Sequence, residues 1–113
     1  MVEIPYAFVD AGVDKSVRNK AYIFQALEIS NIPFIPFWLI NRQVLRPMRW
    51  GAAGTVAAAE QALEGHNSWN LSGGYHHASR AGAEGFCIYN DVGIAYEQLM
   101  QAGRLKPEDR VLI

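Results

Sequence analysis

The order of extended and helical patterns in residues 68–113 constrains the fold more than any other feature of the chain. The stretch SWNLS at 68–72 is predicted to be a short strand, and a long glycine-rich loop follows it. A helix is predicted over residues 91–102, and RVLI at 110–113 is predicted to be a second, buried strand. A strand, a loop, a crossover helix and another strand make a right-handed βαβ unit. We therefore expect an α/β fold with few parallel strands.

Hydrophobic periodicity and capping residues define the helix after the loop and an earlier one over 48–63. Asn90 or Asp91 can cap the start of the later helix, and Gly103 follows its end. Gly65 stands in the corresponding place after the earlier helix, whose many small residues allow close approach of another segment. The residues expected to face inward are Ala52, Val56, Ala59 and Leu63 in the earlier helix and Val92, Ala95, Tyr96 and Leu99 in the later one.

The first part of the chain predicts one helix followed by an irregular segment. Asp14 or Ser16 can cap a helix that ends before Pro33. Residues 31–47 contain three prolines, which exclude a central strand because proline cannot donate a hydrogen bond to a neighbouring strand. We expect a loop or a short edge strand there. The residues at helical spacing in the first helix are Val17, Ala21, Phe24 and Leu27.

Composition bounds the class of protein. The chain has 113 residues of which 50% are hydrophobic, as expected for a single globular domain over residues 1–113. Its net charge of −1, without clustered basic residues, argues against nucleic acid or an anionic membrane as a partner. The longest apolar run, FIPFWLI at 34–40, is far shorter than a membrane span. The lone cysteine, Cys87, excludes an internal disulfide, and a cytoplasmic location is expected.

A sheet of so few strands would leave its edges unpaired. Exposed strand edges tend to pair with another chain, and symmetric copies are the commonest partner. We therefore expect a homo-oligomer that associates through the sheet edge and through the apolar segment 34–40. The tryptophans at positions 38, 50 and 69 are expected to anchor the core or this interface.

The glycine-rich loop carries two adjacent imidazoles, His76 and His77, one residue after the glycine pair Gly73–Gly74. Loops that leave the carboxyl ends of parallel strands form the sites of open α/β sheets. In such a place one neutral imidazole can take a proton from an attacking water, while the other, charged or hydrogen-bonded, orients and later donates a proton. Glu84 and Asp91 are the nearby carboxylates that could hold the far nitrogen of either ring. The alternative is a pair of solvated surface histidines.

Four segments together resemble the histone deacetylase superfamily, which includes acetylpolyamine amidohydrolases and acetoin-utilisation proteins. They are AAGTVAAAEQAL at 52–63, NLSGGYHHA at 70–78, GFCIYND at 85–91 and the closing RVLI. The resemblance covers about residues 47–113. It implies an arginase/deacetylase-like three-layer fold, here partial and completed by oligomerisation, with a zinc ion at the carboxyl ends of the strands. It implies that His76 and His77 act on metal-bound water as general base and as electrostatic or acid partner.

The resemblance also implies that Gly85 and Phe86 line the channel for the acetylated amine. Cys87, beside them, is expected to be a small buried core residue and not a nucleophile, because no nearby residue indicates a lowered pKa. In the family, a strand like RVLI leads into an Asp-x-Asp-x-His segment with two zinc ligands, whereas this sequence ends at Ile113. We expect a truncated domain without zinc ligands of its own. The remaining candidate ligands show no recognised spacing: His66, His76, His77, Glu84 and Asp91.

Two functions follow as alternatives. The first is a non-catalytic, self-associating deacetylase-like module that binds a small ligand at the histidine loop. The second is a component or fragment of a zinc-dependent amidohydrolase that removes acetyl groups from acetyl-lysine or acetylated amines. Zinc analysis and an acetyl-lysine hydrolysis assay distinguish them, because the second needs ligands that the first does not.

Overall fold

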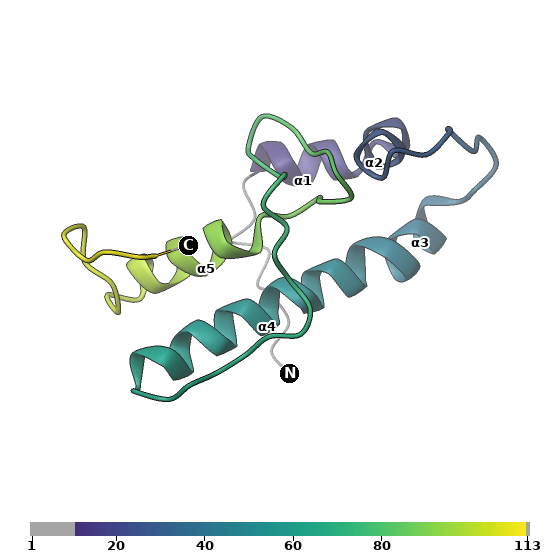
Figure 1. The fold of residues 1–113 in the computed structure, drawn as a ribbon. Helices are drawn as coiled ribbons and strands as arrows, with labels where there is room; N and C mark the ends of the chain where they lie inside the picture. The colour runs from purple at the N-terminus through teal and green to yellow at the C-terminus, as the bar shows by residue number, and fades with distance from the viewer. Residues whose placement is uncertain (1–10, 113) are drawn as a thin grey trace.

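The structure, a computed structural model, describes residues 11–112 as a set of helices joined by long irregular segments (Figure 1). The long helix formed by α3, η2 and α4 makes the diagonal of the molecule, α5 lies alongside α4, and α1 and α2 lie above them. None of the described helices is both long and apolar enough to cross a membrane. The elements are α1 (Ala11–Val17), α2 (Lys20–Ala26), α3 (Phe37–Ile40), the π-helical turn η2 (Asn41–Leu45), α4 (Arg46–Leu63) and α5 (Asp91–Gln101).

The fold differs from the expected α/β class, because residues 11–112 contain no strand. The segment 68–72 is extended, but its polar side chains bind α4: the Ser68 hydroxyl donates to the carbonyl of Ala58, and Asn70 Nδ2 donates to the carbonyl of Gly51 at 2.8 Å. No described backbone hydrogen bond joins this segment to residues 110–112. An extended segment becomes a strand only where another backbone pairs with it.

Three further expectations depended on this sheet and differ from the structure of residues 11–112. The partial three-layer arrangement with parallel strands is wrong for residues 11–112, and these residues offer no sheet edge for association. The strand expected at 110–113 is an irregular tail across α5 as far as residue 112, and Ile113 lies outside the described residues.

The prediction of an irregular segment over 31–47 is correct only up to Pro36. From Phe37 onward the chain is helical, and Pro36 itself is the N-cap of α3. Pro47 lies in the first turn of α4, directly after the π-helical turn in which the Arg46 amide donates to the carbonyl of Asn41. The π turn shifts the hydrogen-bonding pattern by one residue before Pro47, so proline stands in a first-turn position where the N–H group that it lacks is not required. A helix can therefore continue through a position that the sequence marks as a break.

The first predicted helix is two short helices. α1 begins at Ala11, before either predicted cap, and ends at Val17. α2 starts after Asn19, whose side-chain oxygen accepts a 3.0 Å hydrogen bond from the amide of Ala21. Asparagine is a favoured N-cap because this bond satisfies one of the free amides of the first turn.

The helices α4 and α5 have the predicted extents to within two residues. Gly65 ends α4 with φ of +87°, and its amide donates to the carbonyl of Ala62. Asn90 caps α5 by accepting a 2.8 Å hydrogen bond from the Gly93 amide, and Gly103 follows the helix with φ of +69°. Glycine accepts these left-handed conformations without the steric cost of a Cβ atom.

The core has a main cluster, formed by α1, α2, η2 and the segment before α5, and a smaller one at Ala52 and Ala53 of α4. Ile94 of α5 packs against both clusters and so joins the two parts. The largest completely buried side chains are Ile23, Leu45, Ile88 and Asp91. Asp91 is the one ionisable group in this set, and it lies at the start of the site described next.

Candidate functional site

The carboxylate of Asp91 fixes the loop that carries the histidines. Asp91 is 1% exposed and accepts three hydrogen bonds, one from a side chain of α4 and two from consecutive loop amides. Thr55 Oγ1 donates to Oδ2 at 2.6 Å, the Gly74 amide donates to Oδ2 at 3.0 Å, and the Tyr75 amide donates to Oδ1 at 2.8 Å. A buried carboxylate is tolerated when its oxygens are bonded in this way. One side chain thus joins α4, α5 and the backbone just before His76.

Asn70 extends this network toward the start of the loop. Its Nδ2 group donates to Thr55 Oγ1 at 2.8 Å as well as to the carbonyl of Gly51 at 2.8 Å. Its Oδ1 atom accepts from the Ser72 amide at 3.2 Å. Every polar atom of the Asn70 side chain therefore has a partner, so the loop leaves α4 in one defined direction.

The network leaves no space for a side chain at Gly73. A Cβ atom there would lie 2.6 Å from Asp91 Oδ2, 2.8 Å from Thr55 Oγ1 and 3.0 Å from Asn70 Nδ2. The φ angle of Gly73 is +148°, which side chains rarely adopt. The glycine pair before the histidines is thus required by packing at Gly73, while at Gly74 the space is open and φ is +79°.

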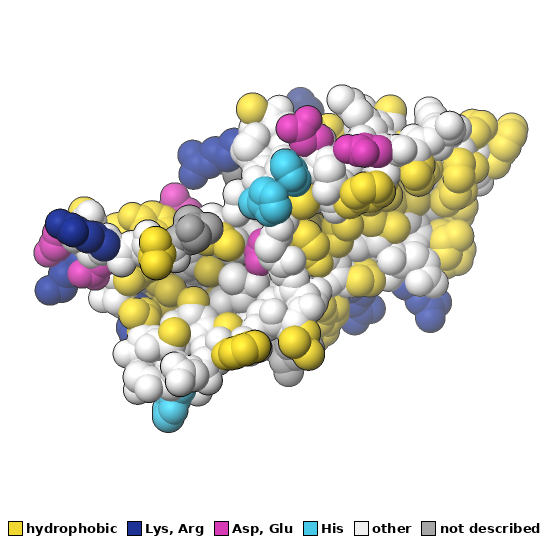
Figure 2. Space-filling view, viewed as in Figure 1, with side chains coloured by type: hydrophobic (Ala, Val, Ile, Leu, Met, Phe, Trp, Pro, Cys, Tyr) yellow, Lys and Arg dark blue, Asp and Glu magenta, His cyan; other side chains and the backbone are white. Residues whose placement is uncertain are grey.

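His76 and His77 pack against each other on the surface with tilted rings. Their ring centroids lie 4.2 Å apart with planes inclined by 43°, and both side chains are exposed. Figure 2 shows the pair adjoining on one face, well apart from the third histidine. His76 Nδ1 lies 2.9 Å from the carbonyl of Gly74. Because a carbonyl only accepts, Nδ1 carries the proton in this bond, and a neutral His76 then presents a lone pair at Nε2.

Neither carboxylate that the sequence offered as a partner holds an imidazole. Asp91 binds backbone amides and Thr55 instead. Glu84 is exposed, and its backbone carbonyl accepts from the Cys87 amide. A backbone carbonyl, that of Gly74, orients His76 by accepting a hydrogen bond from its Nδ1 atom.

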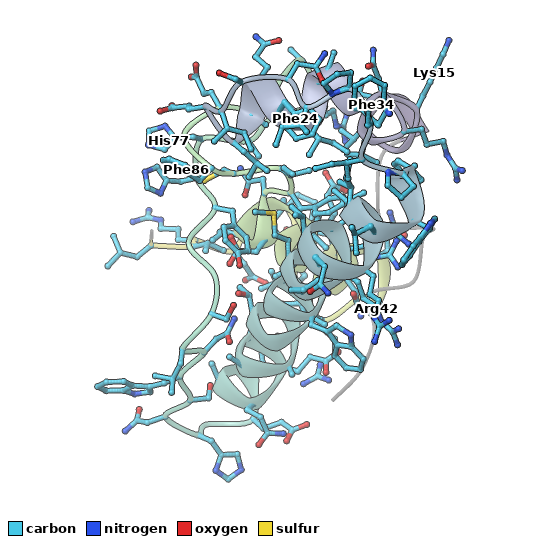
Figure 3. All side chains as sticks on the ribbon, turned by 90° about the vertical axis from the view of Figure 1, so that its right-hand side faces the viewer. Lys15, Phe24, Phe34, Arg42, His77 and Phe86 are labelled. Atoms are coloured by element: carbon cyan, nitrogen blue, oxygen red, sulfur yellow. The ribbon has the colours of Figure 1, made fainter. Side chains whose placement is uncertain are left out.

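Gly85 and Phe86 form a tight turn that packs on His77. Both residues have positive φ, +56° and +62°, and the Cys87 amide closes the turn on Glu84 at 3.0 Å. A Cβ atom at Gly85 would lie 2.9 Å from His77 Cδ2. The Phe86 side chain is 58% exposed, and Figure 3 shows it on the same edge of the molecule as His77. The two predicted substrate-binding residues therefore lie beside one of the two predicted catalytic residues.

Cys87 is buried, as expected for a small core residue, and its thiol donates to the carbonyl of Gly85 at 3.4 Å. Behind the loop, Asn90 Nδ2 donates to the carbonyl of Ala78 at 3.0 Å. Asn90 therefore caps α5 and also holds the end of the histidine segment. The sequence offered Asn90 and Asp91 as alternative caps, and the structure gives them separate roles.

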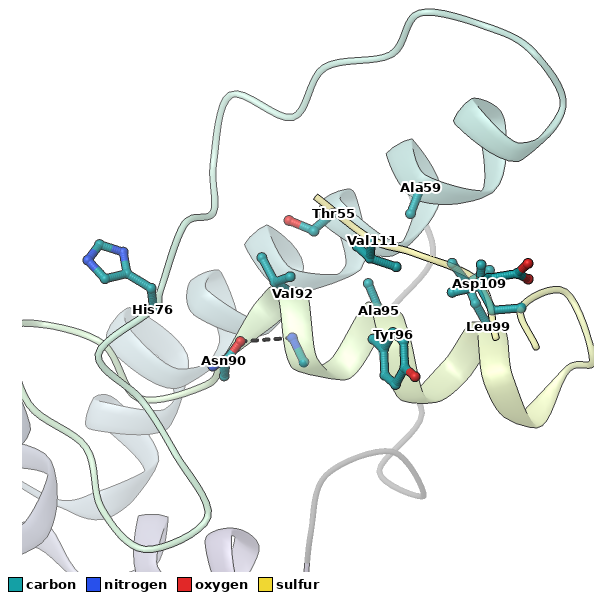
Figure 4. A pocket seen from close by; sticks show the side chains of 12 residues that line it. Thr55, Ala59, His76, Asn90, Val92, Ala95, Tyr96, Leu99, Asp109 and Val111 are labelled. Atoms are coloured by element: carbon teal, nitrogen blue, oxygen red, sulfur yellow. Dashed lines mark hydrogen bonds between the residues drawn. The ribbon is translucent and has the colours of Figure 1, made fainter. Parts of the chain in front are cut away.

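A groove of about 580 Å³ runs between α4 and α5 and reaches His76 at one end (Figure 4). Thr55 and Asn90 lie near the histidine end, and Asp109 lies toward the other. The walls are mainly apolar, which suits a ligand with a hydrophobic body and a polar end. Its other lining residues are Ala59, Val92, Gly93, Ala95, Tyr96, Leu99, Leu105 and Val111.

The described residues do not fit a catalytic zinc site. No three histidine, cysteine, aspartate or glutamate side chains come together within residues 11–112. The Asp91 carboxylate is already bonded to three donors, and His66 lies beyond the end of α4. A catalytic zinc needs three protein ligands. The zinc that the family resemblance implies would need ligands from outside this part of the chain.

Sequence reasoning missed Thr55, Asn70 and Glu28. Thr55 is the one hydroxyl residue in the small-residue stretch 52–63, and this polar interruption was an available signal. Asn70 lies in an extended segment between Trp69 and Leu71. Both of these neighbours are exposed, whereas the Asn70 side chain binds α4. Glu28 Oε1 accepts from the Gly85 amide at 3.2 Å across 57 residues of sequence, which no local pattern indicates.

Comparison with known proteins shows the family to which the chain belongs. The profile of the histone deacetylase domain matches residues 9–113. The chain is 32% identical to histone deacetylase 2 of Arabidopsis thaliana over 79 residues, which is 70% of this chain and 20% of that protein. It is 42% identical to the acetoin utilization protein AcuC of Bacillus subtilis (strain 168) over 50 residues, which is 42% of this chain and 13% of AcuC.

The AcuC protein of Staphylococcus xylosus gives 46% identity over 50 residues, again 42% of this chain and 13% of that protein. The chain thus spans about a fifth or less of the length of these relatives. No solved structure matches it significantly. The family predicted from the four sequence segments is confirmed by the match over nearly the whole chain, and this chain belongs to the histone deacetylase family.

Proposed function

We propose that this chain supplies the paired-histidine part of a histone deacetylase-type amide hydrolase. The single observation that carries the proposal is the exposed His76–His77 pair, held on a loop that Asp91 ties to two helices and flanked by the Gly85–Phe86 turn. The proposed ligand is an acetylated amine, such as the side chain of acetyl-lysine. Its acetamide would meet the imidazoles, and its apolar stem would lie against Phe86.

The chemistry proposed for the pair is proton transfer. In the hydrolysis of an acetamide, water adds to the carbonyl carbon, the C–N bond breaks, and the leaving nitrogen takes up a proton to give acetate and an amine. The free lone pair at Nε2 of His76 can accept a proton from the water, and the adjoining His77 can return one to the nitrogen. A preformed loop favours this exchange because the rings need no reorganisation.

We propose that the described residues bind the acetylated amine without turning it over by themselves. The support is the absence of a three-ligand group within residues 11–112. Purified protein is expected to hold well under one zinc per chain and to release no acetate from an acetyl-lysine peptide. Stoichiometric zinc together with turnover by this chain alone would contradict the proposal.

Ligand binding gives a direct test. Nε-acetyl-lysine amide is titrated into isotope-labelled protein while the amide and imidazole resonances are followed. Shifts are expected at His76, His77 and Phe86, and they should be lost in His77→Ala. His66→Ala is the matched control, because His66 lies on a separate exposed turn. Shifts confined to other regions, or none at saturating ligand, would overturn the proposal.

A second candidate function is self-association through the apolar segment 34–40. Its supporting observation is the exposure of two aromatic side chains, Phe34 at 94% and Trp38 at 63%. They belong to the segment around the start of α3, which lies at one end of the molecule (Figure 1). Sedimentation velocity is expected to show a dimer that the double variant Phe34→Ser/Trp38→Ser converts to a monomer. Trp69→Ser is the control, because Trp69 is 88% exposed but lies outside the segment. A monomeric wild-type protein would exclude this function.

We also propose a cytoplasmic location. The support is Cys87, a single buried thiol that can form no disulfide within the described residues.

A further inference from the structure

Two residues with strained backbones, Glu28 and Phe86, lie close together beside the histidine pair, because Glu28 binds the residue that precedes Phe86. Among residues 11–112, the non-glycine residues with positive φ are Glu28 at +55° and Phe86 at +62°. Such angles are uncommon for residues with a Cβ atom, and for a bulky residue such as phenylalanine they are outliers. Strain of this kind gathers at functional sites, where the surrounding structure holds it in place. Hydrogen bonds hold Glu28 and Phe86 in these conformations.

Glu28 occupies the position after α2 that glycine usually takes. The Glu28 amide donates to the carbonyl of Gln25 at 3.0 Å, and the Ile29 amide donates to the carbonyl of Phe24 at 3.1 Å. These two bonds form the Schellman motif, in which the residue with left-handed backbone is most often glycine. A glutamate at this position has a less favourable backbone than glycine, and it brings a carboxylate that glycine lacks.

The side chain of Glu28 accepts a hydrogen bond from the turn that carries Phe86. Glu28 Oε1 lies 3.2 Å from the Gly85 amide. The next amide, that of Phe86, donates to the carbonyl of Ala26 at 2.9 Å. This carbonyl is in the last turn of α2, where backbone oxygens have no partner within the helix. The end of α2 thus receives two consecutive amides of the turn, one on a carboxylate and one on a carbonyl.

The opposite side of the same turn contacts the histidine pair. A Cβ atom at Gly85 would lie 2.9 Å from His77 Cδ2 and 3.1 Å from Cγ. The position of the turn therefore determines its contact with the His77 ring. Held between α2 and His77, Phe86 keeps its side chain 58% exposed beside the imidazoles.

We propose that Glu28 is a positioning residue for the acetyl-amine site, an assignment that rests on the proposed function. By accepting the Gly85 amide, its carboxylate fixes the left-handed Gly85–Phe86 turn against His77. The turn in turn presents the Phe86 ring as an apolar wall for the stem of the ligand. Glu28 touches no ligand itself and acts through Gly85.

Three substitutions separate this role from simple stabilisation of α2. Glu28→Gln keeps an oxygen acceptor, Glu28→Ala removes it, and Glu28→Gly removes it while relieving the backbone. Glu108→Ala is the control, because Glu108 is an exposed glutamate with no described contact to this turn. The readouts on the full chain are amide hydrogen exchange at Gly85, the nuclear Overhauser effect between Gly85 Hα and the His77 ring, and the thermal midpoint.

Glu28→Ala is expected to raise the exchange rate of the Gly85 amide about tenfold, the change that follows loss of one hydrogen bond of ordinary strength. It is also expected to weaken the Gly85–His77 Overhauser effect. Glu28→Gln should restore both signals to wild-type values. Glu28→Gly should raise or preserve the thermal midpoint and yet loosen the turn as Glu28→Ala does. A purely structural cap would instead give a Glu28→Gly protein whose turn is as ordered as that of the wild type.

The assignment is overturned if Glu28→Ala and Glu28→Gly leave the Gly85 exchange rate and the His77 contact unchanged. It is also overturned if Glu28→Gln loosens the turn as much as Glu28→Ala. These readouts need no ligand. A wild-type protein that shows the expected turn signals but does not bind Nε-acetyl-lysine amide would therefore remove the proposed function while leaving the positioning role of Glu28 in place.

Discussion

Thr55 on α4 donates a 2.6 Å hydrogen bond to Asp91 at the start of α5, although 36 residues of sequence separate them. The same carboxylate accepts the amides of Gly74 and Tyr75, so one contact between two helices also sets the position of the loop before the histidines. The site and the packing of the helices are therefore coupled. A substitution that breaks this contact should affect both the stability of the domain and the order of the loop.

Replacing Asp91 tests this coupling. Asp91→Ala leaves three donors without their acceptor and is expected to lower the free energy of unfolding by about 3 kcal/mol. Asp109→Ala is the control, because Asp109 is exposed and, within the described part of the chain, its side chain accepts only the Lys106 amide. Its expected loss is below about 1 kcal/mol. Urea unfolding followed by circular dichroism measures both, and equal losses would contradict a special role for Asp91.

Substitutions at three glycines separate steric clash from backbone strain. Gly73→Ala places a Cβ atom 2.6 Å from Asp91 Oδ2 at a positive φ. We expect a loss of about 3 kcal/mol from the combined clash and strain. Gly74→Ala has open space but a φ of +79°, so strain alone should cost about 1 kcal/mol. Gly82→Ala meets no neighbour, and its effect should stay within about 0.5 kcal/mol. Chemical denaturation gives the order, and a Gly73→Ala variant as stable as Gly82→Ala would show that the network can shift to make room.

The thiol of Cys87 reports on the order of the segment behind the histidines. Cys87 is 6% exposed, so its reaction with a disulfide reagent requires local opening. We expect the native rate to be at least about tenfold below the rate in denaturant. In the double variant Cys87→Ser/Ser30→Cys the thiol lies at an exposed position and should react at nearly the same rate in both states. A native Cys87 that reacts as fast as the cysteine at position 30 would show that this segment opens freely.

The raised pKa of Tyr22 is expected to lower the stability of the protein at alkaline pH. Burial raises the pKa of its phenol above the usual 10.0, because the charged phenolate is disfavoured next to the core. The unfolded chain then loses the proton first. The stabilising contribution is present below the unfolded pKa of about 10 and falls as the pH rises toward the folded pKa.

Unfolding measured in steps above pH 9 tests this prediction. Tyr22→Phe should flatten the alkaline decline of the unfolding free energy. Tyr96→Phe, on a more exposed tyrosine of α5, should leave the decline as in the wild type. The same slope in the wild type and in Tyr22→Phe would contradict the prediction.

The parts of the fold that follow from local interactions could be predicted from the sequence. The extents of α4 and α5 depend on hydrophobic spacing and on caps such as Asn90 and Gly65, whose hydrogen bonds span only three or four residues. The histone deacetylase family could also be recognised from short segments. Two other features could not be predicted from the sequence: the helix that continues through Pro47 and the break between α1 and α2 before Asn19. They depend on the π turn and on the docking of α2, which are determined by packing.

The site shows the same division. The sequence by itself placed His76, His77, Gly85 and Phe86 in one loop. The two histidines are neighbours in the chain, and so are Gly85 and Phe86. Only the tertiary structure decided that Asp91 would bind the loop backbone, that Glu28 would reach Gly85, and that the extended segment at 68–72 would lie on α4 without forming a strand. The physical reason is that these outcomes depend on which distant donor or acceptor is close enough to bond, whereas a helix cap finds its partner within its own turn.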